Sequence, residues 1–153
     1  MHTQRWLGWF ANRGHDVHLI TDHPGNINQV TEYDIRPRPD NRGRFARYRD
    51  LNFNIYWVRK RIKPIQTVRR LVKEIAPDVL HLHTLYYPAY LGIYSNVHPM
   101  VVTPWNGDIV VHDKRFTRWR KMIIQGALRM ADLITVDSRD LGKNCLQYKG
   151  VEK

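Results

Sequence analysis

The chain has 153 residues, which fits one domain with a single hydrophobic core, and its hydrophobic fraction of 42% argues against disorder. No apolar run approaches the roughly 20 residues of a membrane-spanning helix, and no signal peptide opens the chain, so we expect a cytoplasmic protein. The lone Cys145 excludes an internal disulfide and a multi-cysteine zinc site, while the net charge of +11 favours an anionic partner.

The first third of the chain predicts a helix followed by strands. Residues 2–13 form an amphipathic helix on which Trp6, Leu7 and Phe10 share a face, and Gly14 is its C-terminal stop. Runs rich in β-branched residues then predict a strand at residues 16–21 and an edge strand at residues 29–35.

Helices and strands alternate through the rest of the chain. Residues 45–60 are predicted to be helical in part, and Pro64 is predicted to start a clearer helix. The further predicted elements are a strand at 78–83, a helix at 89–95, a strand at 100–103, a helix at 114–130, a strand at 132–136 and a helix capped by Ser138. The last two helices are expected to bury Phe116, Trp119, Ile123, Ala127 and Met130, and Leu141, Cys145 and Tyr148. This alternation predicts an α/β fold, a Rossmann-like parallel sheet flanked by helices.

Two of the predicted strands end in polar residues, and these ends form the candidate site. Pro77–Thr84 carries His81 and His83 at alternate positions, so both histidines lie on one face of the sheet. The strand at 100–103 leads directly into Pro104-Trp-Asn-Gly-Asp108. Because open α/β sheets bind ligands at the carboxyl ends of their strands, we expect these two ends to form one wall of an active-site cleft.

The individual residues favour different roles. We interpret His81 as a hydrogen-bonded core histidine and His83 as a cleft residue, since a metal site needs a third ligand that the sequence does not supply. Gly107 allows a ligand to approach the backbone closely. Asp108 can accept hydrogen bonds from sugar hydroxyls or orient a reacting group, or it can simply cap a following helix. Trp105 is either a packing residue or a platform for the face of a sugar.

The positive charge is concentrated in the middle of the chain. Thirteen of the 25 Lys and Arg residues lie between Arg36 and Lys73. Such a segment is either a solvated face or a surface that attracts anionic membrane, phosphate or nucleic acid.

Several segments, in order, resemble the start of the family-four glycosyltransferases with the GT-B fold. They are His2-Thr-Gln-Arg-Trp-Leu, Arg13-Gly-His-Asp-Val-His-Leu-Ile-Thr21, Pro77-Asp-Val-Leu-His-Leu-His83, Val101-Val-Thr-Pro-Trp-Asn-Gly-Asp-Ile109 and Ala131-Asp-Leu-Ile-Thr-Val-Asp-Ser138. The resemblance implies an N-terminal, acceptor-side domain, a separate C-terminal domain for the nucleotide-sugar donor, retention of anomeric configuration, and no metal or other cofactor.

The resemblance also implies roles for particular residues. His2 and Thr3 would lie near the donor phosphates, and His83 and Thr84 would line the acceptor side. The segment Trp105, Asn106, Gly107 and Asp108 occupies the position where many relatives place a catalytically important histidine. Trp105 stands in that place here. The candidate catalytic residue is Asp108, whose carboxylate could orient a reacting group.

The chain departs from the family pattern at both ends. It starts at the first helix, without the central strand and Gly-rich loop, and it ends at Gly150-Val-Glu-Lys153, where the family continues into the donor domain and its two Glu residues. We therefore expect residues 1–153 to be a single acceptor-side domain, cut at both ends. Because a sheet without its middle strand loses apolar burial, we expect low stability and no transfer activity from this chain alone.

The sequence thus predicts the N-terminal domain of a retaining glycosyltransferase that transfers a hexose to a lipid-linked or other sugar acceptor in polysaccharide or glycolipid biosynthesis. The basic segment would hold it peripherally on the inner face of an anionic membrane. The alternatives are a basic nucleic-acid-binding domain, or half of a GT-B-fold sugar-nucleotide epimerase. No nucleic-acid-binding motif is present, so we expect no nucleic-acid partner.

Overall fold

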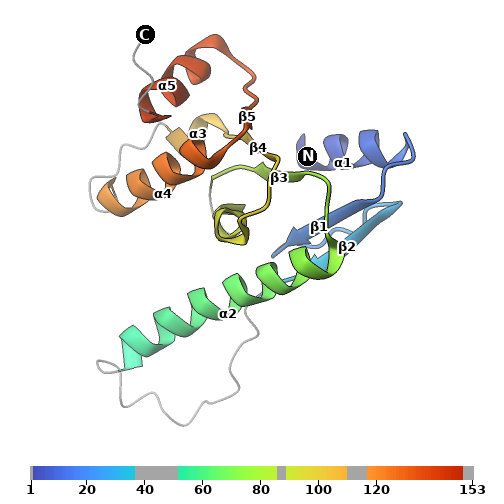
Figure 1. The fold of residues 1–153 in the computed structure, drawn as a ribbon, viewed down its shortest axis with the longest axis horizontal. Helices are drawn as coiled ribbons and strands as arrows, with labels where there is room; N and C mark the ends of the chain where they lie inside the picture. The colour runs from blue at the N-terminus through green and yellow to red at the C-terminus, as the bar shows by residue number, and fades with distance from the viewer. Residues whose placement is uncertain (1, 37–51, 86–88, 110–116, 150–153) are drawn as a thin grey trace. The chain divides into compact units, whose positions relative to one another are not determined.

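The computed structural model describes residues 2–36, 52–85, 89–109 and 117–149 (Figure 1). The chain divides into two compact units, Met1–Val68 and Arg69–Lys153. The first unit contains α1 (His2–Ala11), β1 (Val17–Thr21), β2 (Val30–Asp34) and most of α2 (Asn52–Ile75). The second contains β3 (Leu80–His83), the 3₁₀ helix η1 (Ala89–Ser95), β4 (Met100–Thr103), α3 (Asn106–Ile109), α4 (Thr117–Met130), β5 (Leu133–Ile134) and α5 (Arg139–Lys149).

In the first unit, β1 and β2 form a parallel pair in which Val17 lies beside Val30. The connection between them is short for a parallel pair, which usually needs a crossover of about a dozen residues or more. Two features allow the short path. Asn26 and Gln29 adopt positive φ angles, and the Glu32 carboxylate accepts hydrogen bonds from the backbone N–H groups of Gly25 and Ile27.

Helix α1 has the predicted glycine stop, but it ends at Ala11, two residues earlier than predicted, and its buried face differs in part. Gly14 has a φ of 82° and its N–H donates to the carbonyl of Ala11, which is the expected glycine stop. The buried side chains are Leu7 and Ala11, whereas Trp6 is 41% exposed. The prediction that Trp6 shares the buried face was therefore wrong, because the small Ala11 supplies the second contact one turn beyond Leu7.

Helix α2 corrects a second prediction. The residue expected to start a helix, Pro64, lies inside a continuous helix from Asn52 to Ile75. A proline removes one backbone donor, and the flanking turns retain their own hydrogen bonds, so the helix continues through it. Most of the basic segment between Arg36 and Lys73 lies outside the residues whose side chains the structure describes.

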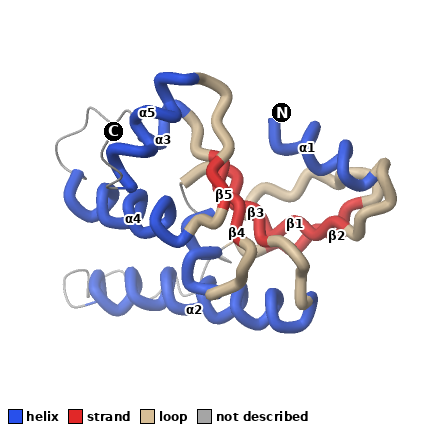
Figure 2. The backbone as a smooth tube through the Cα atoms, turned by 45° about the horizontal axis from the view of Figure 1, so that its top comes forward, coloured by secondary structure: helices blue, strands red, loops and turns tan. Residues whose placement is uncertain are grey.

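In the second unit, β3, β4 and β5 form a parallel sheet with β4 in the centre. Leu82 and Val102 pair in register and are both buried. Helix η1 packs on β3 and α4 packs on β4. Figure 2 draws all the strands in red and labels β3, β4 and β5 as well as α4 and α5. A glycine at position 92 permits the close approach of η1, since a Cβ there would overlap Leu82 Cδ2.

The helices of this unit follow the predicted pattern with one shift. In α4, Ala127 is fully buried as expected, but Ile124 and Leu128 complete the buried stripe, while Ile123 and Met130 are only half-buried. Phe116 and the Trp119 side chain lie outside the described residues. In α5, the Ser138 hydroxyl accepts a hydrogen bond from the Leu141 N–H at 3.2 Å, which confirms the predicted cap.

The α/β architecture with parallel strands and flanking helices is confirmed. The five strands found in the described part of the chain pair as two sheets, β1–β2 and β3–β4–β5, and each sheet lies in its own unit. The short α3 (Asn106–Ile109) was not among the predicted elements. Among the described residues, no helix combines the length and apolar composition needed to cross a membrane.

Candidate functional site

The carboxyl ends of β3 and β4 lie side by side, as the sequence predicted. His83 pairs in register with Thr103, and the ladder continues one step further because the Thr84 N–H donates to the Thr103 carbonyl at 2.9 Å. Strand β3 ends at His83 and strand β4 ends at Thr103. The two polar segments after the strands are therefore held together by the sheet itself.

Asp108 connects these two strand ends. One carboxylate oxygen accepts a hydrogen bond from the Thr84 hydroxyl at 2.8 Å, and the other accepts the N–H groups of Leu85 at 2.9 Å and Trp105 at 2.7 Å. The side chain is only 1% exposed. Asp108 lies in α3 and caps the N-terminus of that helix through the Trp105 N–H, so it acts both as a helix cap and as a link to β3.

Thr84 has a strained backbone at the end of β3. Its φ is 79°, in a region that β-branched residues rarely adopt. Such a conformation costs on the order of 1–3 kcal/mol and persists only where the surroundings hold it. Here the hydrogen bonds that the Asp108 carboxylate accepts from the Thr84 hydroxyl and the Leu85 N–H supply that restraint.

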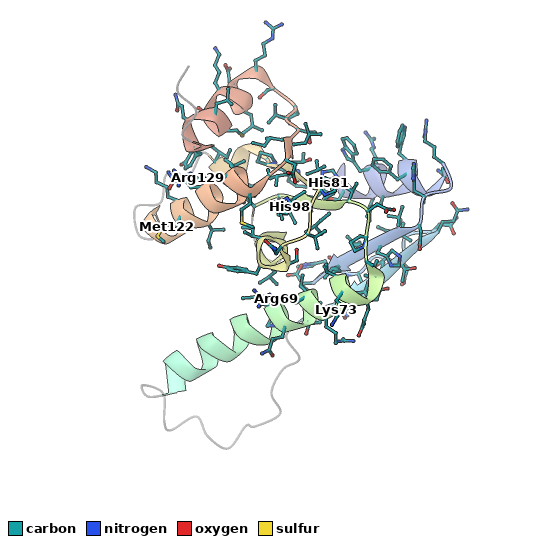
Figure 3. All side chains as sticks on the ribbon, in the orientation of Figure 1. Arg69, Lys73, His81, His98, Met122 and Arg129 are labelled. Carbon is teal, nitrogen blue, oxygen red and sulfur yellow. The ribbon has the colours of Figure 1, made fainter. Side chains whose placement is uncertain are left out.

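Two histidines and two threonines form a polar row across the three strands. The His81 and His83 rings are 4.0 Å apart between centroids. His81 Nε2 is 2.6 Å from Thr103 Oγ1, which is 2.5 Å from Thr135 Oγ1 just beyond β5. Figure 3 labels His81 on β3. His81 is thus hydrogen-bonded and half-buried, in keeping with its interpretation as a core histidine.

Burial keeps both histidines uncharged. It lowers the pKa of His81, and burial together with the neighbouring His81 lowers the pKa of His83 to about 4. Both rings are therefore neutral near pH 7 and can donate and accept hydrogen bonds without carrying charge. Among the described residues, no group of three or more His, Cys, Asp or Glu side chains gathers as a metal site would.

The other residues predicted for the site lie in both units: Trp105 and Gly107 in the second, and His2 and Thr3 in the first. Trp105 is 40% exposed and Gly107 is exposed, with open space where a Cβ would lie. His2 and Thr3 belong to α1 in the first unit, where Thr3 is half-buried. The side chains of His2 and Asn106 lie outside those that the structure describes.

Two parts of this network were missed by the sequence interpretation. Thr103 and Thr135 both follow apolar residues at strand ends, in Val-Val-Thr and Leu-Ile-Thr, and this repeated pattern was the available signal. Cys145 on α5 was noted as the lone cysteine and as a buried residue of the last helix, without a link to Asp108. Burial raises the pKa of its thiol to about 11, and the negative charge of Asp108 adds to the shift, so the thiol stays protonated.

A family comparison bears on this arrangement. The sequence profile described as glycosyl transferase 4-like matches residues 1–138. The chain belongs to this glycosyltransferase family. The match runs from α1 through β5 and includes the strand ends that Asp108 connects, so this network is part of the family domain. No curated protein matches the chain closely enough to count as a relative.

Proposed function

We propose that this chain is the acceptor-side domain of a retaining, nucleotide-sugar-dependent glycosyltransferase, and that the ends of β3 and β4 bind the acceptor sugar. The observation that carries the proposal is the buried Asp108 carboxylate, which ties Thr84, Leu85 and Trp105 into one fixed arrangement. Sites for small ligands need such preorganised walls, because ordering a loose wall at binding reduces affinity.

The chemistry of this edge supports a sugar as the ligand. We name His83, Thr84, Trp105 and Gly107 the acceptor rim. His83 is neutral near pH 7, and Trp105 presents an indole that is 40% exposed. Neutral hydrogen-bonding groups and an aromatic face suit the hydroxyls and the apolar face of a sugar ring better than a pyrophosphate, which favours cations or helix N-termini.

Asp108 then serves as a positioning residue. Its 1% exposure and its three donors fit a carboxylate that fixes the rim, rather than one that itself reaches the reacting atoms. The earlier assignment of Asp108 as catalytic is thus refined to a role exerted through Thr84 and Trp105. His2, Thr3 and Asn106 remain proposed contacts of the substrates.

The finer features of the activity belong to the same proposal. A hexose is transferred from a nucleotide sugar to a lipid-linked or other sugar acceptor, without a metal or other cofactor, during polysaccharide or glycolipid synthesis. The donor is bound mainly by residues outside 1–153. The enzyme works at the cytoplasmic face of a membrane whose anionic lipids attract the cationic chain, which carries a net charge of +11.

The proposal is tested by amide NMR of the chain titrated with a panel of methyl glycosides. The expected result is that one or more glycosides shift the amide signals of residues 83–85 and 105–108. Trp105→Ala should abolish these shifts while the remaining spectrum stays native. Trp9→Ala, which removes another exposed indole in the first unit, is the matched control and should leave them unchanged.

Two outcomes would contradict the proposal. One is that no glycoside in the panel perturbs the acceptor rim. The other is that the shifts persist in Trp105→Ala. Separately, sugar transfer from a nucleotide sugar by the isolated chain, together with a cooperative thermal transition, would show that the donor site does not lie elsewhere.

A further inference from the structure

The outward face of α1 has a composition that folding does not explain. Successive residues of a helix are rotated by about 100°, so Arg5, Trp6 and Trp9 project from the side opposite the buried pair Leu7 and Ala11. Arg13, in the turn that follows α1, lies over the Trp9 ring. Trp6 is 41% exposed and Trp9 is 49% exposed. The solvent side of an amphipathic helix normally carries polar residues, and here it carries two indoles.

These side chains form an organised surface. The Arg13 guanidinium carbon lies 3.6 Å from the centroid of the Trp9 ring, and Arg13 Nη1 donates to the Trp9 carbonyl at 3.2 Å. Trp6 stacks against Phe10 with ring centroids 6.0 Å apart. An open hollow of about 460 Å³ is lined by Arg5, Trp6, Trp9 and Phe10, and we name these residues together with Arg13 the α1 aromatic surface.

The charge of this surface has one sign. Helix α1 contains no Asp or Glu, and the first acidic residue of the chain is Asp16. The Asp16 carboxylate lies 3.1 Å from His18 Nε2 and so pairs with that side chain. The two arginines of the surface therefore create a local positive potential next to apolar rings. An occupant must combine an apolar region with negative charge.

We propose that the α1 aromatic surface docks on a bilayer containing anionic phospholipid. Tryptophan side chains favour the boundary between acyl chains and headgroups, where the ring is partly dry and its N–H remains hydrogen-bonded. Arginine stems extend along the rings while the guanidinium groups contact lipid phosphates. This proposal rests on the membrane association proposed above and assigns it to a surface distinct from the basic segment between Arg36 and Lys73.

The test measures co-sedimentation of the full chain with vesicles made of two thirds phosphatidylcholine and one third phosphatidylglycerol. The parent chain should bind these vesicles and should not bind vesicles of pure phosphatidylcholine. The double variant Trp6→Ala/Trp9→Ala should lose at least about tenfold in partition coefficient. The double variant Arg5→Gln/Arg13→Gln should lose about fivefold for each charge removed, with binding that becomes less sensitive to salt.

The controls separate this surface from the general positive charge. Arg129→Gln/Arg139→Gln removes two exposed charges from the second unit, and Tyr94→Ala removes a 41% exposed aromatic ring there. Both should bind vesicles within about twofold of the parent. Circular dichroism should show native helix content for all variants, since none of the substituted side chains is buried.

The proposal is overturned if the tryptophan variant binds like the parent, or if the charge control weakens binding as much as Arg5→Gln/Arg13→Gln. It is also overturned if the parent ignores anionic vesicles but self-associates in a way that Trp6→Ala/Trp9→Ala abolishes, since a second copy would then be the occupant. The glycoside titration does not involve vesicles, so failure of docking and failure of the acceptor rim are separately visible.

Discussion

At the scale of single residues, the buried Asp108 decides how the strand ends are arranged. Its carboxylate accepts hydrogen bonds from the Thr84 hydroxyl and from two backbone N–H groups. Because the side chain is only 1% exposed, water cannot replace these hydrogen bonds. A buried donor left without an acceptor costs about 1–3 kcal/mol, and hydrogen bonds to a charged group are the stronger ones. The residue therefore stabilises the second unit as well as shaping its rim.

We expect Asp108→Asn to lower the free energy of unfolding by about 1–2 kcal/mol, because a neutral amide oxygen would replace the charged carboxylate oxygen that accepts the N–H groups of Leu85 and Trp105. Urea denaturation followed by circular dichroism measures the change. Asp140→Asn is the control, since that side chain is 92% exposed and should change stability by less than about 0.5 kcal/mol. Equal stability of the two variants would contradict the assigned role of Asp108.

His83 makes the stability of the fold depend on pH. Its pKa is lowered to about 4 by burial and by His81, whereas an unfolded histidine titrates near 6.5. Between these values the unfolded chain binds a proton that the folded chain does not, so acidification favours unfolding. Well above pH 6.5 the ring is unprotonated in both states, so this site no longer makes stability depend on pH.

We expect the free energy of unfolding to fall by about 2 kcal/mol from this site between pH 6.5 and pH 4, allowing for solvent at the half-buried ring. His83→Gln should flatten that part of the stability profile measured by urea denaturation. His23→Gln, at a side chain that is 88% exposed, should keep the profile of the parent. A profile that His83→Gln leaves unchanged would show that the ring titrates normally.

At the scale of elements, a glycine sets the packing of η1 on β3. A methyl group at Gly92 would overlap Leu82 Cδ2, and Leu82 is itself buried. The leucine would have to leave its rotamer inside a packed core, which usually costs about 1–3 kcal/mol. The close approach of the two elements therefore depends on the absence of a side chain at position 92.

We expect Gly92→Ala to destabilise the chain by about 1–3 kcal/mol, and Gly92→Ala/Leu82→Ala to cost less than the sum of the two single changes. Gly126→Ala in α4 is the control for a glycine without a steric conflict, because nothing lies within 4 Å of the position that a Cβ would take there. That change should stabilise the helix by about 0.5–1 kcal/mol. Thermal denaturation ranks the four variants, and additive costs at positions 82 and 92 would exclude the steric explanation.

Elements also show what periodicity can and cannot predict. The spacing of apolar residues identified α1, α4 and α5, yet it placed Trp6 on the buried face and shifted the stripe of α4 by one position. Burial depends on which neighbour is available, and Ala11, Ile124 and Leu128 fit their neighbours better than the larger or adjacent residues. Pro64 misled in another way, since one lost hydrogen bond does not end a helix of 24 residues.

At the scale of the whole chain, alternation of helices and strands was sufficient to predict an α/β fold with parallel strands. The pairing of those strands into two sheets depends on long-range contacts that periodicity does not record. The neighbouring ends of β3 and β4 were predicted because parallel strands end at a common edge. The positive φ of Thr84 and the burial of Asp108 were not predictable, since both result from hydrogen bonds between distant segments.

The row of His81, Thr103 and Thr135 has a directional consequence. A hydroxyl has one hydrogen, so Thr103 can donate to only one of its two partners. If His81 Nε2 carries the proton, Thr103 accepts from the ring and its own hydrogen can be donated to Thr135. If Nδ1 carries it, Thr103 must donate to the ring, and Thr135 must then be the donor to Thr103. The tautomer of one ring on β3 is thereby transmitted as the orientation of a hydroxyl just beyond β5, two strands away.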